Sequence, residues 1–263
     1  MNKQAKASGG RGIEWTDYTW NPIGGCKHAC RWQMPDGVIA ECYAETVANR
    51  VAQAAYPRGF AHHYWNPHKL NEPLSVKTPS RIFLDSMSDL MGAWIPSHQI
   101  EKVLETCRQA SHHTFQLLTK NAPRLAEFDF PPNVWVGVSS PPTFMFGNRL
   151  SPDQQARMVT RMMRILSAVD VPVRWMSIEP LSFNIAPLLE DSPLQWAVIG
   201  AASSGAKTYQ PKPAWVRNLL YTLDLQGVAV FFKGNLDWNP HREAFPPEAR
   251  GQLSLFDHME EQR

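Results

Sequence analysis

Residues 81–90 read RIFLDSMSDL, an apolar run that ends in a cluster of hydroxyls and carboxylates. The first four residues are typical of a buried β-strand, and the polar residues follow where that strand would end. Five later runs repeat the pattern, each with a polar loop after it. They are Thr114–Leu118, Val134–Val138, Val173–Ile178, Trp196–Ile199 and Val228–Phe232. The repeat predicts strands that are covered on both faces.

Helical patterns lie between these runs. The expected helices are His98–Ala110, Pro152–Val169, Pro213–Leu223 and Cys42–Ala55. Cys107 falls on the apolar stripe of its helix, so we place it in the core. Strands that alternate with helices are typical of parallel β/α units. With a first strand expected around Ile13–Trp20, the sequence predicts an α/β fold, a partial or complete parallel β/α barrel of six to seven strands.

The chain has 263 residues, 43% of them apolar and 19% charged, which suits one barrel-sized domain. We expect a flexible N-terminus over 1–12, a barrel over 13–246 with an irregular insert at 56–79, and a tail over 247–263. The net charge of +2 does not by itself indicate nucleic-acid binding. No apolar run reaches the length of a membrane span and no signal-peptide core is visible, so we expect a cytoplasmic protein without membrane association.

Cys26, Cys30 and Cys42 are spaced C-x3-C-x11-C. In a reducing compartment, clustered cysteines bind metal or do chemistry more often than they form disulfides. A structural zinc needs a fourth ligand such as His28, and the paired C-x2-C spacing is absent. A 4Fe–4S cluster on three thiolates leaves one iron open for an external ligand. Radical S-adenosylmethionine (SAM) enzymes use that arrangement, and the cluster is the favoured hypothesis. The alternative is a zinc-binding, non-enzymatic, DNA-associated module.

Several strings resemble a phage-associated, radical-SAM-like family with a three-cysteine motif and no settled function. They are IEWTDYTWNP at 13–22, GC at 25–26 and ECYAE at 41–45, and further matches follow the later strands up to about residue 246. The chain also has a distant similarity to spore photoproduct lyase. These resemblances imply a radical SAM enzyme that uses a 4Fe–4S cluster and SAM to generate a 5'-deoxyadenosyl radical for repair or modification of DNA. They also imply an electron donor such as flavodoxin or ferredoxin.

The resemblance implies roles for individual residues. Those beyond the three cluster-binding cysteines are Tyr43 at the adenine and in catalysis, Ser86 and Ser88 at the amino group, Lys120 at the carboxylate, Ser139 at the ribose, and Glu179 and Lys233 as catalytic residues that face the substrate. Tyr43 could instead pack a helix start, and Lys233 could be a solvated strand end. Two features depart from the family. The loop GAASSG at 200–205 lacks the usual glutamate, and eleven residues before Cys42 exceed the usual spacing.

The C-terminal string Gln252-Leu253-Ser254-Leu255-Phe256 resembles the peptide that binds the bacterial DNA sliding clamp. In such a peptide Leu255 and Phe256 enter an apolar pocket of the partner, while Gln252 and Leu253 complete the contact. The alternative is that Leu253 and Phe256 fold back onto the barrel as a last turn. The hypothesis that this string binds the sliding clamp predicts a protein that works on DNA at replication or repair sites.

Overall fold

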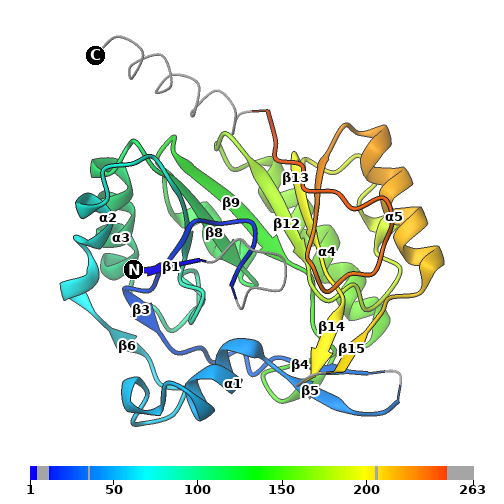
Figure 1. The fold of residues 1–263 in the computed structure, drawn as a ribbon, viewed down its shortest axis with the longest axis horizontal. Coiled ribbons are helices and arrows are strands. Elements are labelled where there is room, and N and C mark those ends of the chain that lie inside the picture. The colour runs from blue at the N-terminus through cyan, green and yellow to red at the C-terminus, as the bar shows by residue number, and fades with distance from the viewer. Residues whose placement is uncertain (5–11, 35, 205–206, 248–263) are drawn as a thin grey trace.

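The computed structural model describes residues 1–4, 12–34, 36–204 and 207–247 of the chain. Its centre is an eight-stranded sheet with the order β1-β2-β7-β8-β9-β12-β13-β16 (Figure 1). The strands are β1 Asn2–Lys3, β2 Tyr18–Trp20, β7 Arg81–Leu84, β8 Thr114–Thr119, β9 Val134–Ser139, β12 Arg174–Ile178, β13 Trp196–Ile199 and β16 Ala229–Phe232. The β1 strand pairs antiparallel with β2, and all other neighbours are parallel.

The predicted α/β class and parallel sheet are confirmed, but the predicted count of six to seven strands is wrong. The eighth strand is β1, whose two polar residues pair with Thr19 and Tyr18 and carry no apolar pattern that would reveal a strand. The first and last strands, β1 and β16, do not pair with each other in the described parts of the chain. The sheet is therefore open there, and a complete barrel is not formed by these residues.

Successive residues of each strand serve two separate apolar clusters, as the two faces of a sheet require. On β9, Val134, Val136 and Val138 join the larger core, which also contains the apolar stripes of the long helices. Trp135 points to the other face, where it packs with three further tryptophans. This alternation explains why the strands read as continuously apolar.

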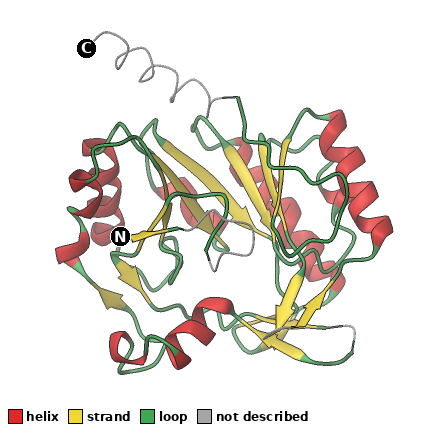
Figure 2. Cartoon of the chain, in the orientation of Figure 1, coloured by secondary structure: helices red, strands yellow, loops and turns green. Residues whose placement is uncertain are grey.

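Three long helices lie against the outer face of the sheet (Figure 2). The α-helices are α1 Tyr43–Arg50, α2 Glu72–Ser75, α3 Ser97–Gln109, α4 Pro152–Ser167 and α5 Pro213–Leu225, and short 3-10 helices span Gln53–Ala55, Pro67–Lys69, Ala122–Glu127 and Ala186–Leu188. Cys107 of α3 is fully buried, as predicted. None of the helices in the described residues is both long and apolar enough to cross a membrane.

Smaller sheets form a second layer beside the carboxyl ends of the parallel strands (Figure 1). They contain β3 Ile23–Gly24 with β6 Tyr64–Trp65, then β4 Arg31–Gln33, β5 Ile39–Glu41, β10 Phe144–Met145 and β11 Asn148–Arg149 in the order β11-β10-β4-β5, and finally β14 Ala202–Ser204 with β15 Lys207–Tyr209. Together with α1, this layer faces the sheet across a cavity.

Candidate active site

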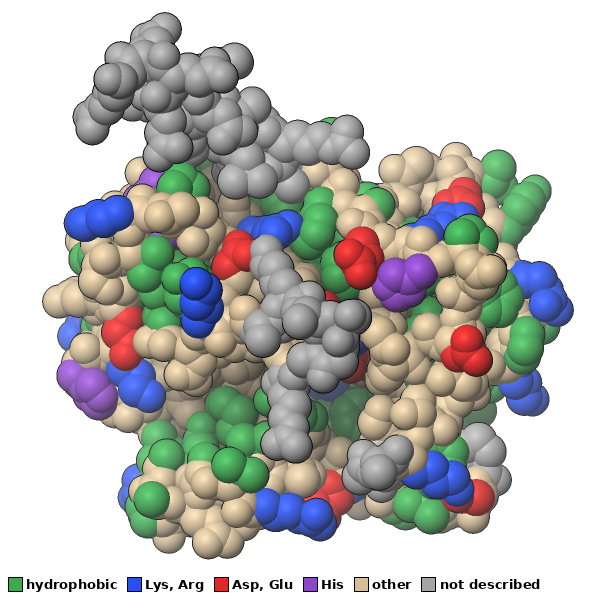
Figure 3. Space-filling view, viewed as in Figure 1, with side chains coloured by type: hydrophobic (Ala, Val, Ile, Leu, Met, Phe, Trp, Pro, Cys, Tyr) green, Lys and Arg blue, Asp and Glu red, His purple; other side chains and the backbone are tan. Residues whose placement is uncertain are grey.

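A cavity of about 540 Å³ lies where the parallel strands end. The cavity is lined by the residue at the carboxyl end of each of five strands: Asp85 directly after β7, Lys120 after β8, Ser139 at the end of β9, Glu179 after β12 and Lys233 after β16. In the space-filling view the molecule is hollowed between the body and the lower layer, and the visible walls are largely apolar (Figure 3). The carboxyl ends of parallel strands are where α/β barrels carry their chemistry.

The structure brings the predicted site residues of the described chain into this one cavity. Those from outside the strand ends are Cys26, Cys30, Cys42, Tyr43, Ser86 and Ser88. Tyr43 begins α1 and is 65% exposed. Their roles remain predictions. The clamp-like residues Gln252, Leu253, Leu255 and Phe256 lie outside the described residues.

The loop with the first cysteine is fixed from two sides. Gly25 has a φ of +84°, and a Cβ there would lie 1.7 Å from the carbonyl oxygen of His62, so only glycine fits. The hydroxyl of Ser88 donates to the Gly25 carbonyl at 2.8 Å. The amide of Cys26 donates to the Phe60 carbonyl at 2.8 Å. The segment predicted as an irregular insert thus supports the cysteine loop.

The eleven residues between Cys30 and Cys42 form the β4–β5 hairpin, which the sequence analysis did not identify. Its register pairs Arg31 with Glu41, so the two cysteines occupy the next position on either strand. The Arg31 guanidinium also forms two hydrogen bonds with the Glu45 carboxylate of α1, at 2.6 and 3.0 Å. The long interval therefore returns on itself and leaves its flanking cysteines opposite each other.

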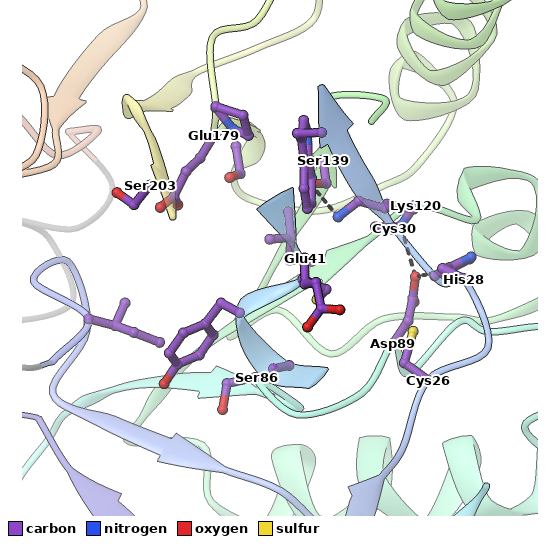
Figure 4. Close-up of a pocket in the computed structure, with 18 of the residues that line it drawn as sticks. Cys26, His28, Cys30, Glu41, Ser86, Asp89, Lys120, Ser139, Glu179 and Ser203 are labelled. Carbon is purple, nitrogen blue, oxygen red and sulfur yellow. Dashed lines mark hydrogen bonds and ion pairs between the residues drawn. The ribbon is translucent and has the colours of Figure 1, made fainter. Parts of the chain in front are cut away.

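A buried carboxylate connects the cysteine loop to two strand ends (Figure 4). Asp89 Oδ2 accepts hydrogen bonds from His28 Nε2 at 2.7 Å and the Lys120 amide at 2.9 Å, and Oδ1 accepts from the Met91 amide at 3.1 Å. Burial raises the Asp89 pKa, but the His28 hydrogen bond and charge, with the Lys120 amide, outweigh it and the net pKa is lowered. The run of polar residues after β7 marked this region in the sequence, but Asp89 received no predicted role, and His28 was considered only as a possible fourth ligand in the zinc alternative.

The thiols lie in an environment that disfavours their charged form. Burial raises the pKa of Cys26 well above its usual range, and it raises the pKa of Cys30 to about 11 although the Lys120 cation opposes it. Burial alone would lower the Lys120 pKa, but the adjacent Cys30, Cys42 and Asp89 raise it overall. The Lys120 ammonium donates to Ser139 Oγ at 2.8 Å (Figure 4). A cation therefore lies ready to compensate thiolates that bind metal.

At another wall of the cavity, Glu179 and Lys233 form an ion pair. A Cβ on Gly200 would lie 3.1 Å from Glu179 Cγ and 3.2 Å from Lys233 Cδ, so a small residue preserves the pair. Asn235 exchanges hydrogen bonds with the backbone of Ala201, at 3.2 and 2.9 Å. The start of the loop after β13 is thus held by Asn235.

Residues 10–260 match the model of a family described as protein of unknown function, DUF5131. The chain belongs to this family. No curated protein matches it.

A mutant spore photoproduct lyase superimposes with a TM-score of 0.51 at 10% identity, over 83% of this chain and 77% of that chain. The spore photoproduct lyase complexed with dinucleoside spore photoproduct has a TM-score of 0.48 at 12% sequence identity. The match covers 80% of this chain and 61% of that chain, so the DUF5131 chain spans less than two thirds of the length of that lyase. A radical SAM methyltransferase from Sphaerobacter thermophilus has a TM-score of 0.41 at 16% sequence identity, over 80% of this chain and 63% of that chain. At 10% identity, the likeness to the mutant lyase with the TM-score of 0.51 shows a shared fold and nothing further.

Proposed function

We propose that this DUF5131 protein is a radical SAM enzyme. Cys26, Cys30 and Cys42 would hold a 4Fe–4S cluster and SAM would occupy its open iron. DNA is the proposed substrate, and repair or modification of a base the proposed reaction. The domain over 13–246 would carry this chemistry.

The observation that carries the proposal is the convergence of three cysteines and the strand-end polar groups on one cavity. Among residues 1–4, 12–34, 36–204 and 207–247, no three His, Cys, Asp or Glu side chains lie close enough together to hold one metal ion. We propose the cluster over zinc on the ligand count, because three thiolates leave one iron open for SAM, whereas a structural zinc needs a fourth ligand.

The chain's own residues suit the parts of SAM. Lys120 uses one ammonium proton toward Ser139, which leaves two donors for a carboxylate. The hydroxyls of Ser86 and Ser88 donate to Asn21 Oδ1 and the Gly25 carbonyl, so their oxygens can still accept from an amino group. Tyr43 offers an exposed ring at the cavity for the adenine. A cluster with SAM bound supplies reductive cleavage of SAM to a 5'-deoxyadenosyl radical, with the electron coming from a flavodoxin- or ferredoxin-like donor.

Glu179 and Lys233 would face the substrate from one wall of the cavity. Paired as they are, they can hold or move a proton between carboxylate and amine at a bound substrate. The DNA assignment is supported by the fold shared with spore photoproduct lyase. A base from a duplex would have to leave the stack to reach the cavity.

Anaerobic reconstitution with iron and sulfide tests the proposal. We expect a brown protein with close to four irons per chain that converts SAM to 5'-deoxyadenosine when dithionite is added. Cys30→Ala should lose iron and activity. Cys107→Ala is the matched control, because Cys107 is buried in the core away from the cavity. A colourless protein that carries one zinc would refute the cluster.

We further propose that the tail over 247–263 recruits the protein to the DNA sliding clamp through Gln252–Phe256. This rests on the sequence of those residues. Deletion of Gln252–Phe256 should abolish binding to the purified clamp and leave iron content unchanged. Unchanged clamp binding would refute recruitment alone.

A further inference from the structure

The β4–β5 hairpin presents one face to the cavity and the other to solvent. Trp32, Met34 and Ala40 are buried and line the cavity, while Gln33 and Ile39 are exposed. This alternation is the period of two that a strand imposes. The hairpin connects two of the cysteines, and its inner face packs with both Cys30 and Cys42.

Trp32 is one of two cavity-lining tryptophans, with Trp15, whose buried indole N–H lacks a partner in the described residues, and it is the one on the hairpin. Its side chain is 9% exposed, and its indole N–H is buried and lacks a hydrogen-bond partner. An indole nitrogen can only donate, so a protein acceptor or a ligand acceptor must satisfy it. A buried donor without a partner costs free energy, and the hairpin carries this cost as it stands. An acceptor on a bound molecule would remove it once the hairpin shifts enough to admit that molecule.

The tip of the hairpin is held by a contact that can open. Asp36 accepts from Lys207 Nζ at 2.5 Å and from the Tyr209 hydroxyl at 3.0 Å, both on β15. The carboxylate and ammonium are well exposed, and exposed ion pairs contribute little to stability. The hairpin is more firmly tied at its base, where Arg31 forms its two hydrogen bonds with Glu45. The tip of the hairpin is therefore held more weakly than its base, so the tip can move while the base stays in place.

We propose that Trp32 is a specificity-determining residue of the cavity. Its indole N–H donates to a ring nitrogen or carbonyl oxygen of a planar heterocycle, and the hairpin closes over that ring. The inference rests on the proposed function and deepens it, since it names a nucleobase as the part of the substrate that is recognised. The Lys120 ammonium lies 6.0 Å from the centre of the Trp32 ring, so the same wall lies beside the cation at the cysteines.

Trp32→Phe tests this role, because it retains an aromatic ring and removes the donor. Binding is measured by fluorescence anisotropy with four single-stranded DNA octamers that differ in one central base. We expect the wild type to prefer one base by about 2- to 10-fold, the range of one hydrogen bond, and Trp32→Phe to bind all four alike. Trp215→Phe on α5 is the control and should retain the preference.

A second readout separates recognition from structure. Since the N–H has no partner in the described residues, Trp32→Phe breaks no hydrogen bond, and the thermal midpoint should fall by no more than the packing of the smaller ring accounts for. A lowered midpoint with retained base preference would overturn the inference, as would equal binding of all four octamers by the wild type. Loss of SAM affinity in place of base preference would assign Trp32 to the cofactor and overturn it too. Iron content and SAM cleavage, measured on the same wild-type samples, report separately on the proposed function.

Discussion

Asp89 offers the sharpest test of how the site is held together. Replacement by Asn retains the shape of the side chain but exchanges one oxygen for an NH2 group. Two donors, His28 Nε2 and the Lys120 amide, converge on Oδ2, and the Met91 amide faces Oδ1. In either orientation the new side-chain amide would place its N–H against at least one buried donor. The substitution therefore leaves an unsatisfied group whichever way the amide turns.

The magnitude follows from these bonds. One buried donor without a partner costs about 1–3 kcal/mol, and the loss of charge from the remaining bonds adds about 1 kcal/mol. We expect Asp89→Asn to lower the free energy of unfolding by about 3 kcal/mol. At about 2–4 °C per kcal/mol, that corresponds to a fall of about 6–12 °C in the thermal midpoint. Since Asp89 holds the cysteine loop through His28, iron content after reconstitution should fall as well.

Urea and thermal unfolding followed by circular dichroism measure the effect. Asp170→Asn, at an exposed position, is the control and should change stability by less than about 0.5 kcal/mol, as is usual for surface sites. A loss under about 1 kcal/mol for Asp89→Asn, with iron content unchanged, would refute the reasoning.

The pH dependence gives an independent check. The Asp89 pKa is lowered in the folded protein, since the His28 contacts outweigh burial, so its stabilisation is present above its usual pKa near 3.9 and is lost as the pH falls through the lower folded value. The difference between wild type and Asp89→Asn should shrink as the pH falls below about pH 4.

Three shorter predictions concern other parts of the site and core. In metal-free protein, the rate at which iodoacetamide alkylates Cys30 should rise about tenfold per pH unit and level off only near pH 11, where the Cys30 pKa lies. A plateau of this rate at about pH 9 would contradict the prediction. Gly137→Ala should cost about 1–3 kcal/mol by thermal unfolding, because its Cβ would lie 2.3 Å from the Trp175 ring; an unchanged midpoint would contradict it. Replacing Gln33–Ile39 by Asn-Gly retains the pairing of Arg31 with Glu41 and should retain iron. Deleting Ala40 within β5 shifts the register by one residue and should lose iron, as iron analysis would show.

Much of the main sheet could be predicted because its strands carry their own signal. The Val134–Ser139 strand and the Arg81–Leu84 strand appear where the apolar runs predicted them. The expected first strand over 13–20 is shorter, because a turn in which the Thr16 amide donates to the Ile13 carbonyl precedes Tyr18–Trp20. The helix expected over 42–55 ends at Arg50, and a 3-10 turn follows it. Both differences are at boundaries, where tertiary contacts decide.

The residues of the candidate site also fall into those that the sequence predicts and those that depend on tertiary contacts. Strand-end residues such as Lys120 and Glu179 could be placed in one cavity because parallel topology alone brings them together. The β4–β5 hairpin escaped notice because each strand has three residues, too few for a clear alternation. Its one local signal was the Asp36-Gly37 pair, a common hairpin turn sequence. The link from His28 to Asp89 spans 61 residues and depends on the fold, so no local pattern could reveal it.

The hairpin also changes the meaning of the long cysteine interval. Chain length between two ligands matters only through where it leaves them, and an antiparallel hairpin returns to its starting point whatever its length. With Arg31 paired to Glu41, Cys30 and Cys42 stand in register as they would across a short turn. The eleven-residue interval therefore need not separate the two cysteines. It also brings Trp32 and Met34 to the cavity, so under the proposed function it would add to the wall that meets the substrate without moving the proposed cluster ligands.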